Sequence, residues 1–99
     1  MNQMFELLSI ELRTIIRVSE LGSFGQVARE LNVQPSSVSK RVRKVEDAIG
    51  VSLFEPRGDG VALTAAGSVL IDQLVRARDI LRTAIADTRH MGIAGIGNL

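Results

Sequence analysis

The stretch SFGQVARELNVQPSSVSKRVRKVEDAIG, residues 23–50, decides the fold. It holds two helical patterns separated by a short turn. Ser23 and Gln26 form a capping box, in which each side chain satisfies a free backbone N–H, so we expect a short helix over 24–31. A proline is tolerated in the first turn of a helix, and Pro35 therefore opens the second helix. Two helices this close in sequence predict a helix-turn-helix unit.

Apolar residues recur at helical intervals in both segments of this unit. The first segment is expected to bury one face: Phe24, Val27, Ala28 and Leu31. The second is expected to bury a stripe with spacings of four, three and four: Val38, Val42, Val45 and Ile49. Gly50 follows this stripe and is a typical residue just beyond a helix end. The two faces predict a small core between the helices.

Helical and β-prone patterns flank the unit. Upstream, a helix is expected over 10–21, ended by Gly22. Downstream, residues 51–63 hold two short β-prone pieces around a Pro- and Gly-rich turn, which predicts a hairpin. Phe24 and Phe54 lie within apolar patterns and are expected in the core rather than on a stacking surface.

A long helix is expected to close the chain. Thr64 is a good N-cap, and the helical pattern reaches about Thr88. A helix over 64–88 spans roughly 37 Å and carries more apolar surface than the preceding residues can bury, so a partner helix is its simplest cover. The stripe expected to meet that partner is Ala66, Leu70, Leu74, Ala77, Leu81 and Ala84.

The composition excludes several classes of function. The 99 residues include 12 Lys and Arg against 11 Asp and Glu, so any preference for nucleic acid depends on where the charges lie. The absence of cysteine and the single histidine argue against disulfides, thiolate metal sites and paired catalytic imidazoles. Three phenylalanines are the only aromatic residues, too few for stacking on single-stranded nucleic acid.

The sequence contains no catalytic set and no membrane signal. A Ser/His/Asp set, a phosphate-binding loop and a convergent pair of carboxylates are all missing, so we expect no enzymatic activity, no metal and no cofactor. No apolar run approaches the roughly 18 residues of a membrane span, and the first residues lack the features of a signal peptide. We therefore expect a cytoplasmic protein.

Four cations lie within five positions of the second helix of the unit: Lys40, Arg41, Arg43 and Lys44. Three serines precede them by about one turn: Ser36, Ser37 and Ser39. Small hydroxyl side chains near a helix N-terminus allow close approach to base edges, and the cations that follow contact bases and phosphates. The pattern favours entry into a DNA major groove, although a solvated basic face has the same charges. Glu46 is expected to pair with Arg43 or Lys40 across a helix turn.

The hairpin offers a second candidate contact. Arg57 lies beside Gly58 and Gly60. This arrangement is typical of a wing that places a cation in the minor groove or on phosphate. On chemistry alone, an ordinary polar turn residue is an equal interpretation.

Taken in order and with matching gaps, these segments resemble the N-terminal winged helix-turn-helix of LysR-type transcriptional regulators over about residues 12–67. The segments that carry the resemblance are Glu20-Leu21-Gly22-Ser23-Phe24, Val27-Ala28-x-x-Leu31, Val38-Ser39-x-x-Val42-x-x-Val45-Glu46, Ile49-Gly50-x-x-Leu53-Phe54 and Leu63-Thr64-x-Ala66-Gly67. The resemblance implies a mainly α fold, with three helices, a two-stranded hairpin wing and a long helix for dimerisation.

The resemblance also implies how the chain is organised. Residues 1–63 would form the winged helix-turn-helix DNA-binding domain and residues 64–89 the linker helix of a homodimer. Residues 90–99 would be the start of a further domain that binds a small-molecule inducer, and residues 92–97 look like its first strand. The chain is then a fragment of a longer protein. The alternative is a naturally short form that antagonises full-length relatives by forming mixed dimers.

The DNA contacts that the family pattern implies are carried over residue by residue. Ser39 and Lys40 match the family's serine and the cation after it, and Ser36 falls where Pro or Ser often occurs. Ser23 stands at a helix N-terminus, where backbone N–H groups hold phosphate. The expected set is Ser23, Gln34, Pro35, Ser36, Ser39, Lys40, Arg43, Lys44 and Arg57.

Two positions depart from the family pattern. Pro35 stands where Gln is common, and Gln34 comes one place earlier. Pro56 stands where the family has Arg, and Arg57 comes one place later. Both departures bear on sequence preference more than on general affinity. The leading interpretation is a dimeric bacterial regulator domain on double-stranded DNA; the alternative is a winged-helix module whose long helix docks on another protein.

Overall fold

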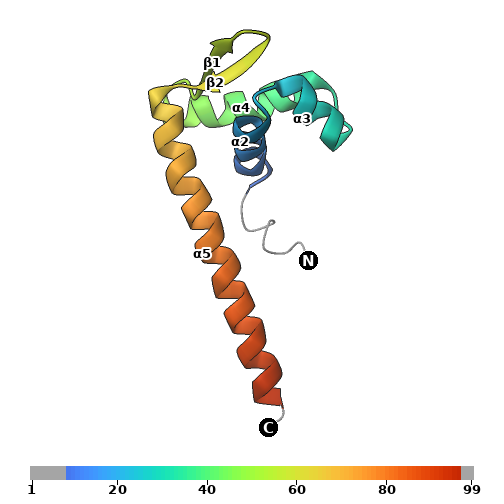
Figure 1. Ribbon diagram of the computed structural model, residues 1–99, viewed down its shortest axis with the longest axis vertical. Helices are drawn as coiled ribbons and strands as arrows, with labels where there is room; N and C mark the ends of the chain where they lie inside the picture. Colours follow the sequence, from blue (N-terminus) through green and yellow to red (C-terminus); the bar gives the residue numbers. More distant parts are fainter. Residues whose placement is uncertain (1–8, 97–99) are drawn as a thin grey trace.

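The structure, a computed structural model, describes residues 9–96. Its elements in chain order are α2 (Ile10–Leu21), α3 (Phe24–Leu31), α4 (Pro35–Ile49), β1 (Phe54–Arg57), β2 (Gly60–Leu63) and α5 (Ala65–Ile96). Figure 1 shows α2 to α4 and the hairpin gathered into a body, from which α5 extends as a long arm. The expected order of three helices, a two-stranded hairpin and a long helix is confirmed.

Hydroxyl side chains cap three of the helices. Each accepts a hydrogen bond from a backbone N–H in the first turn: Leu12 N to Ser9 Oγ (3.1 Å), Gln26 N to Ser23 Oγ (3.1 Å) and Gly67 N to Thr64 Oγ1 (2.9 Å). Helices α2, α3 and α4 end at residues with left-handed backbone: Gly22, Asn32 and Gly50. These local signals set the element boundaries, because caps satisfy backbone groups that the helix leaves unpaired.

The core lies where the three short helices meet the start of the hairpin. Its buried cluster is Ile15, Val18, Val27, Ala28, Val38, Val42 and Leu53. Phe24 and Phe54 pack against this cluster. Their rings contact each other edge to face, with ring centroids 6.0 Å apart. Two residues expected in the core are exposed instead, Leu31 at 41% and Ile49 at 49%. Each is the last residue of its helix, beyond the part that the neighbouring elements cover.

An ion pair clamps α3 onto α2. Arg17 donates from Nε to Glu30 Oε2 at 2.6 Å and from Nη2 to the other carboxylate oxygen. A third bond runs from Nη1 to Glu20 at 3.2 Å. Hydrogen bonding to Arg17 holds the pKa of Glu30 below its ordinary value. Because the guanidinium engages Glu30 through two parallel bonds, the pair fixes orientation as well as distance.

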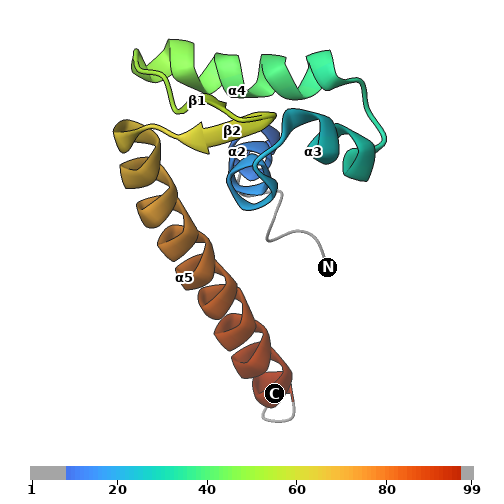
Figure 2. The same ribbon diagram turned by 45° about the horizontal axis from the view of Figure 1, so that its top comes forward.

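The hairpin is held against the turn between α2 and α3. Its strands are antiparallel, with Arg57 opposite Gly60. Val61 N donates to Gly22 O at 3.0 Å. A Cβ at Gly60 would lie 2.2 Å from the same carbonyl oxygen, so the close approach requires a glycine. The hairpin and the helix-turn-helix therefore form one packed unit (Figure 2).

The arm is longer than expected. Helix α5 has 32 residues and ends at Ile96, past the expected end near Thr88, so the strand expected in the tail is wrong over 92–96. A strand needs a neighbouring strand to pair with, whereas a helix satisfies its N–H and C=O groups within one segment. Residues 97–99 of the tail lie outside the described range. Among the described residues, no helix is both long and apolar enough to span a membrane.

Candidate nucleic-acid interface

The face of α4 opposite its buried valines is open to solvent. Ser36, Lys40 and Arg43 are exposed on this face, and Ser39 is half-buried at its edge. Within the described residues, neither Lys40 nor Arg43 forms an ion pair. The structure therefore presents two uncompensated cations and two hydroxyls along one side of a helix.

At the start of α4 lie Gln34 and Pro35, the first of the two places where the sequence departs from the family pattern. Gln34 is the N-cap, but its side chain makes no capping hydrogen bond and is exposed. Pro35 occupies the first turn and is exposed as well. The amide of Gln34 remains available to an outside partner, next to a proline that offers no N–H.

The other two cations of the cluster contact residues of α2. Arg41 lies on the side of α4 that faces α2, and its Nη1 is 3.4 Å from Thr14 Oγ1. Lys44 Nζ is 3.5 Å from Glu11 Oε2, although the lysine side chain is largely exposed. The pKa of Glu11 is below its ordinary value, chiefly because of a backbone hydrogen bond and further because of Lys44. The exposed basic face is therefore narrower than the sequence cluster.

Asp47 is a residue of this face that the sequence interpretation missed. It is exposed and continues the row from Ser36, Lys40 and Arg43 at spacings of four, three and four. The same spacing identified the valine stripe, so the signal was present in the sequence. Asp47 adds a negative charge one turn beyond Arg43.

Glu46 does not form the expected pair with Arg43 or Lys40. Its carboxylate accepts a hydrogen bond from Leu53 N at 2.7 Å. The neighbouring carbonyl of Ser52 accepts from the Thr64 hydroxyl at 2.7 Å. Because Leu53 is fully buried, its amide needs a partner, and Glu46 supplies one.

These contacts form a junction between α4, the hairpin and the arm. Thr64 N donates to Leu53 O at 2.9 Å, next to the hydroxyl bond just described. A Cβ at Gly67 would lie 2.1 Å from Leu53 O, so the first turn of α5 packs directly on this backbone. The junction, formed by Glu46, Ser52, Leu53, Thr64 and Gly67, links three elements through one short segment.

Arg57 of the wing has acidic residues near it on both sides in sequence. Arg57 is exposed at the end of β1, and the turn that follows contains Gly58, which has a φ of 58°. Glu55 and Asp59 are exposed on either side in sequence. A recess of about 240 Å³ lies between α4 and the hairpin, with Arg43 on its α4 wall and Pro56 on its hairpin wall.

Ser23 is half-buried, and its hydroxyl is occupied by the cap of α3. Because the hydroxyl oxygen accepts in this cap, its proton can still donate to an outside anion, together with the backbone N–H groups of the helix N-terminus.

The six residues of α5 that were expected to meet a partner helix differ in how much of each side chain is exposed. Leu70 packs against the core, and Leu74 is only 8% exposed, so both serve the protomer itself. Leu81 is half-buried, while the three alanines, Ala66, Ala77 and Ala84, are exposed.

Large apolar residues lie beside those alanines. Val69, Ile80 and Met91 are 66%, 69% and 69% exposed. They recur every 11 residues, close to three helical turns, and so share one face of α5. The exposed face of the arm consists of these three residues and the three alanines. Among residues 9–96, no group of three or more His, Asp or Glu side chains is arranged to hold a metal ion.

Comparisons with known proteins identify relatives of this body. Residues 10–68 match the family described as "Bacterial regulatory helix-turn-helix protein, lysR family". The chain is 32% identical over 89 residues to the HTH-type transcriptional regulator TfdS of Cupriavidus pinatubonensis, covering 90% of this chain and 30% of that protein. It is 33% identical over 81 residues to a probable nitrogen assimilation transcriptional activator of Synechococcus elongatus, covering 82% and 26%. The chain thus spans under a third of the length of these relatives.

Solved structures share the fold. The DNA-binding domain of CbnR, in a complex with DNA, superposes with a TM-score of 0.74 and 26% identity, covering 83% of this chain and 94% of that one. The BenM DNA-binding domain, in its complex with benA site 1 DNA, gives a TM-score of 0.76 at 21% identity and covers 83% and 92%. The second likeness concerns the fold alone.

Proposed function

The chain belongs to the lysR family of bacterial regulatory helix-turn-helix proteins, and from that premise we infer that it reads double-stranded DNA with α4 in the major groove. The observation that carries this proposal is the open face of α4 described above. It combines Lys40 and Arg43, free of ion pairs within the described residues, with hydroxyls at the N-terminal end of the helix. An α-helix fits the major groove, where long cationic side chains reach guanine edges and phosphates.

The roles within this face follow from chemistry. Arg43 and Lys40 donate to base acceptors, and Ser36 and Ser39 allow close approach. Gln34 takes the amide role that Pro35 cannot fill, because an amide both donates to and accepts from adenine.

Three further cationic or polar positions act on the sugar–phosphate backbone. Lys44 and the α3 N-terminus at Ser23 contact phosphates, and Arg57 of the wing contacts phosphate or the minor groove. Glu55, Asp59 and Asp47 oppose these contacts. We therefore expect weaker non-specific binding than the number of cations alone suggests.

The arm makes the protein a homodimer in this proposal. Two α5 helices pack antiparallel through the exposed face of Val69, Ile80, Met91 and the three alanines, with the half-buried Leu81 at its edge. Leu70 and Leu74 stay packed on their own protomer. Residues 1–63 then serve as the DNA-binding domain, and the linker helix continues past 64–89 into the tail. A response to a small-molecule inducer belongs to the remaining length of the relatives. The protein acts as a transcriptional regulator in the bacterial cytoplasm, without a catalytic step.

The test is a titration of fluorescent duplexes selected from a random pool, followed by anisotropy at two salt concentrations. Lys40→Ala and Arg43→Ala are each expected to weaken binding by more than about tenfold, since each removes a contact to bases. Arg89→Ala, a cation far along the arm, is the matched control and is expected to change nothing. Affinity must also fall steeply with salt as counterions are released.

Unchanged affinity for both α4 variants would reject the placement of this helix in the groove. Absence of binding at low salt would instead favour the protein-interaction alternative.

A further inference from the structure

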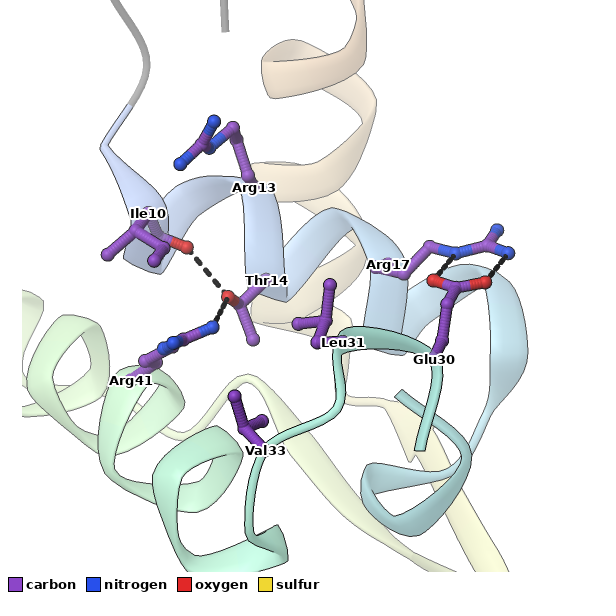
Figure 3. Close-up of a pocket in the computed structure, with 8 residues that line it drawn as sticks. All are labelled: Ile10, Arg13, Thr14, Arg17, Glu30, Leu31, Val33 and Arg41. Atoms are coloured by element: carbon purple, nitrogen blue, oxygen red, sulfur yellow. Dashed lines mark hydrogen bonds and ion pairs between the residues drawn. The ribbon is translucent and has the colours of Figure 1, made fainter. Parts of the chain in front are cut away.

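A pocket on the side of the body away from the DNA-reading face of α4 has no role in the proposed function. It lies between α2, the turn from α3 to α4 and the inner side of α4, and has a volume of about 410 Å³ (Figure 3). This volume falls in the range of roughly 300–1,000 Å³ that is typical of small-molecule sites. Its walls include Ile10, Leu31 and Val33.

The pocket exposes apolar surface that the core does not use. Leu31, which the sequence pattern placed in the core, is 41% exposed here, and Ile10 is 43% exposed. A ligand with an apolar body would remove both side chains from water, which is favourable in proportion to the area covered.

The charges around the pocket are not balanced. Three arginines line it, and among residues 9–96 only Arg17 has a carboxylate partner, through its two-pronged pair with Glu30. Arg41 has no carboxylate partner among the described residues, and its contact is the 3.4 Å approach to Thr14 Oγ1. The Thr14 hydroxyl donates its own proton to Ile10 O at 2.7 Å, so its oxygen serves Arg41 as an acceptor.

Arg13 is a second cation of the pocket that has no carboxylate partner within residues 9–96. Its Nε is buried and has no hydrogen-bond partner among the described residues. A buried donor without a partner is uncommon, because desolvation is then not repaid by a hydrogen bond. In Figure 3, Arg13 and Arg41 lie on either side of Ile10 and Thr14, while the Arg17–Glu30 pair closes one end.

We propose that this pocket binds a small organic anion, a carboxylate with an apolar chain or ring. The apolar body would lie on Ile10, Leu31 and Val33, and the carboxylate would accept hydrogen bonds from Arg41 or Arg13. Binding needs no DNA, so the proposal stands independently of the DNA-reading role. The ligand would contact α2, the turn and α4 together, and so would brace the helix-turn-helix from behind.

Three probes with one apolar body and different charges test this proposal: hexanoate, hexanol and hexylammonium. Each is titrated into the 15N-labelled protein, and the amide signals of Ile10, Thr14, Leu31 and Val33 are followed. Hexanoate is expected to shift these signals with saturation, and at least about fivefold more tightly than hexanol, because a charge-assisted hydrogen bond is lost with the alcohol. Hexylammonium is expected to leave them unchanged.

Two variants locate the site. Arg41→Gln and Leu31→Ala are each expected to weaken hexanoate binding by about threefold to tenfold while the spectrum stays dispersed. Arg89→Gln, an exposed arginine far along the arm, is the matched control and should bind hexanoate as the wild type does.

The proposal is overturned if hexanoate produces no saturable shift or if the three probes shift the same signals equally. Inorganic phosphate binding as tightly as hexanoate would also overturn it, since the apolar walls would then contribute nothing.

Discussion

The body and the arm of this protein satisfy their apolar side chains in opposite ways. In the body, Ile15, Val18, Val27, Val38 and Leu53 are fully buried by their own chain. In the arm, Val69, Ile80 and Met91 are each about two-thirds exposed although they share one helix face. The body is therefore specified by contacts within the protomer, whereas this face of the arm makes few contacts with the described residues, and we propose that a second copy covers it.

The difference predicts which property a substitution will change in each region, folding stability or association. A change in the body is felt as a loss of folding free energy, because close packing leaves no room for an added group. A change on the exposed face of the arm alters association instead, since that face contributes little to the fold of the single chain. Two pairs of variants and one set of three test this division.

The largest effect is expected from a glycine pair within the one helix α5. Gly67 packs on the body, where a Cβ would meet Leu53 O at 2.1 Å, while nothing lies within 4 Å of a Cβ at Gly92. Gly67→Ala is expected to cost about 3 kcal/mol in the free energy of unfolding. Gly92→Ala is expected to add about 0.5–1 kcal/mol, since alanine favours a helix over glycine. Urea denaturation at one protein concentration measures both, and equal stabilities would contradict the division.

The second pair separates the exposed face of the arm from the rest of its surface. Ile80→Asp places a charge on that face, and the dimer dissociation constant is expected to rise by at least about 100-fold, because both copies bring the charge into the interface. Ile93→Asp makes the same change at 72% exposure on another side of the helix, and is expected to have little effect.

Sedimentation velocity over a range of concentrations reads the outcome of this second pair. Equal weakening by the two aspartates would show that the arm associates through a different face, and no weakening by either would argue against a dimer held by α5.

The smallest effect is expected at the junction between body and arm. Glu46→Ala removes the acceptor of Leu53 N, and should cost about 1–2 kcal/mol of folding stability because the amide stays buried. Glu46→Gln keeps an oxygen acceptor and should recover most of this loss. Asp47→Ala, its exposed neighbour, should stay within about 0.5 kcal/mol of the wild type. Thermal unfolding distinguishes the three, and a Gln variant as unstable as Ala would show that charge rather than the hydrogen bond matters.

The sequence predicted the elements of the body because their signals are local. Ser23 and Thr64 mark helix starts and Gly22 and Gly50 mark helix ends within a few residues of chain. The valines of α4 predicted its buried face by their spacing alone. Family membership and the helix-turn-helix were accessible for the same reason.

Contacts between elements that are distant in sequence could not be predicted from such local signals. Glu46 has plausible cationic neighbours one turn away, but it bonds to Leu53 because the fold buries that amide. Leu70 and Leu74 fit a partner stripe in sequence, but they cover the protomer's own body. Asp47 was overlooked although the helical spacing places it beside Arg43. The end of the arm was misjudged because its glycine-rich tail resembles a strand in sequence, while the helix continues through it to Ile96.

Thr64 is the single residue between the last strand of the wing, which ends at Leu63, and the first residue of the arm, Ala65. A connection this short cannot absorb an insertion as a loop would. One added residue near the start of α5 would turn everything beyond it by about 100° and advance it by about 1.5 Å. An insertion of three or four residues would leave the arm roughly 60° or 40° out of phase with the body, whereas seven residues, close to two full turns, would nearly restore the phase. The rotational phase of the arm therefore depends on its exact length.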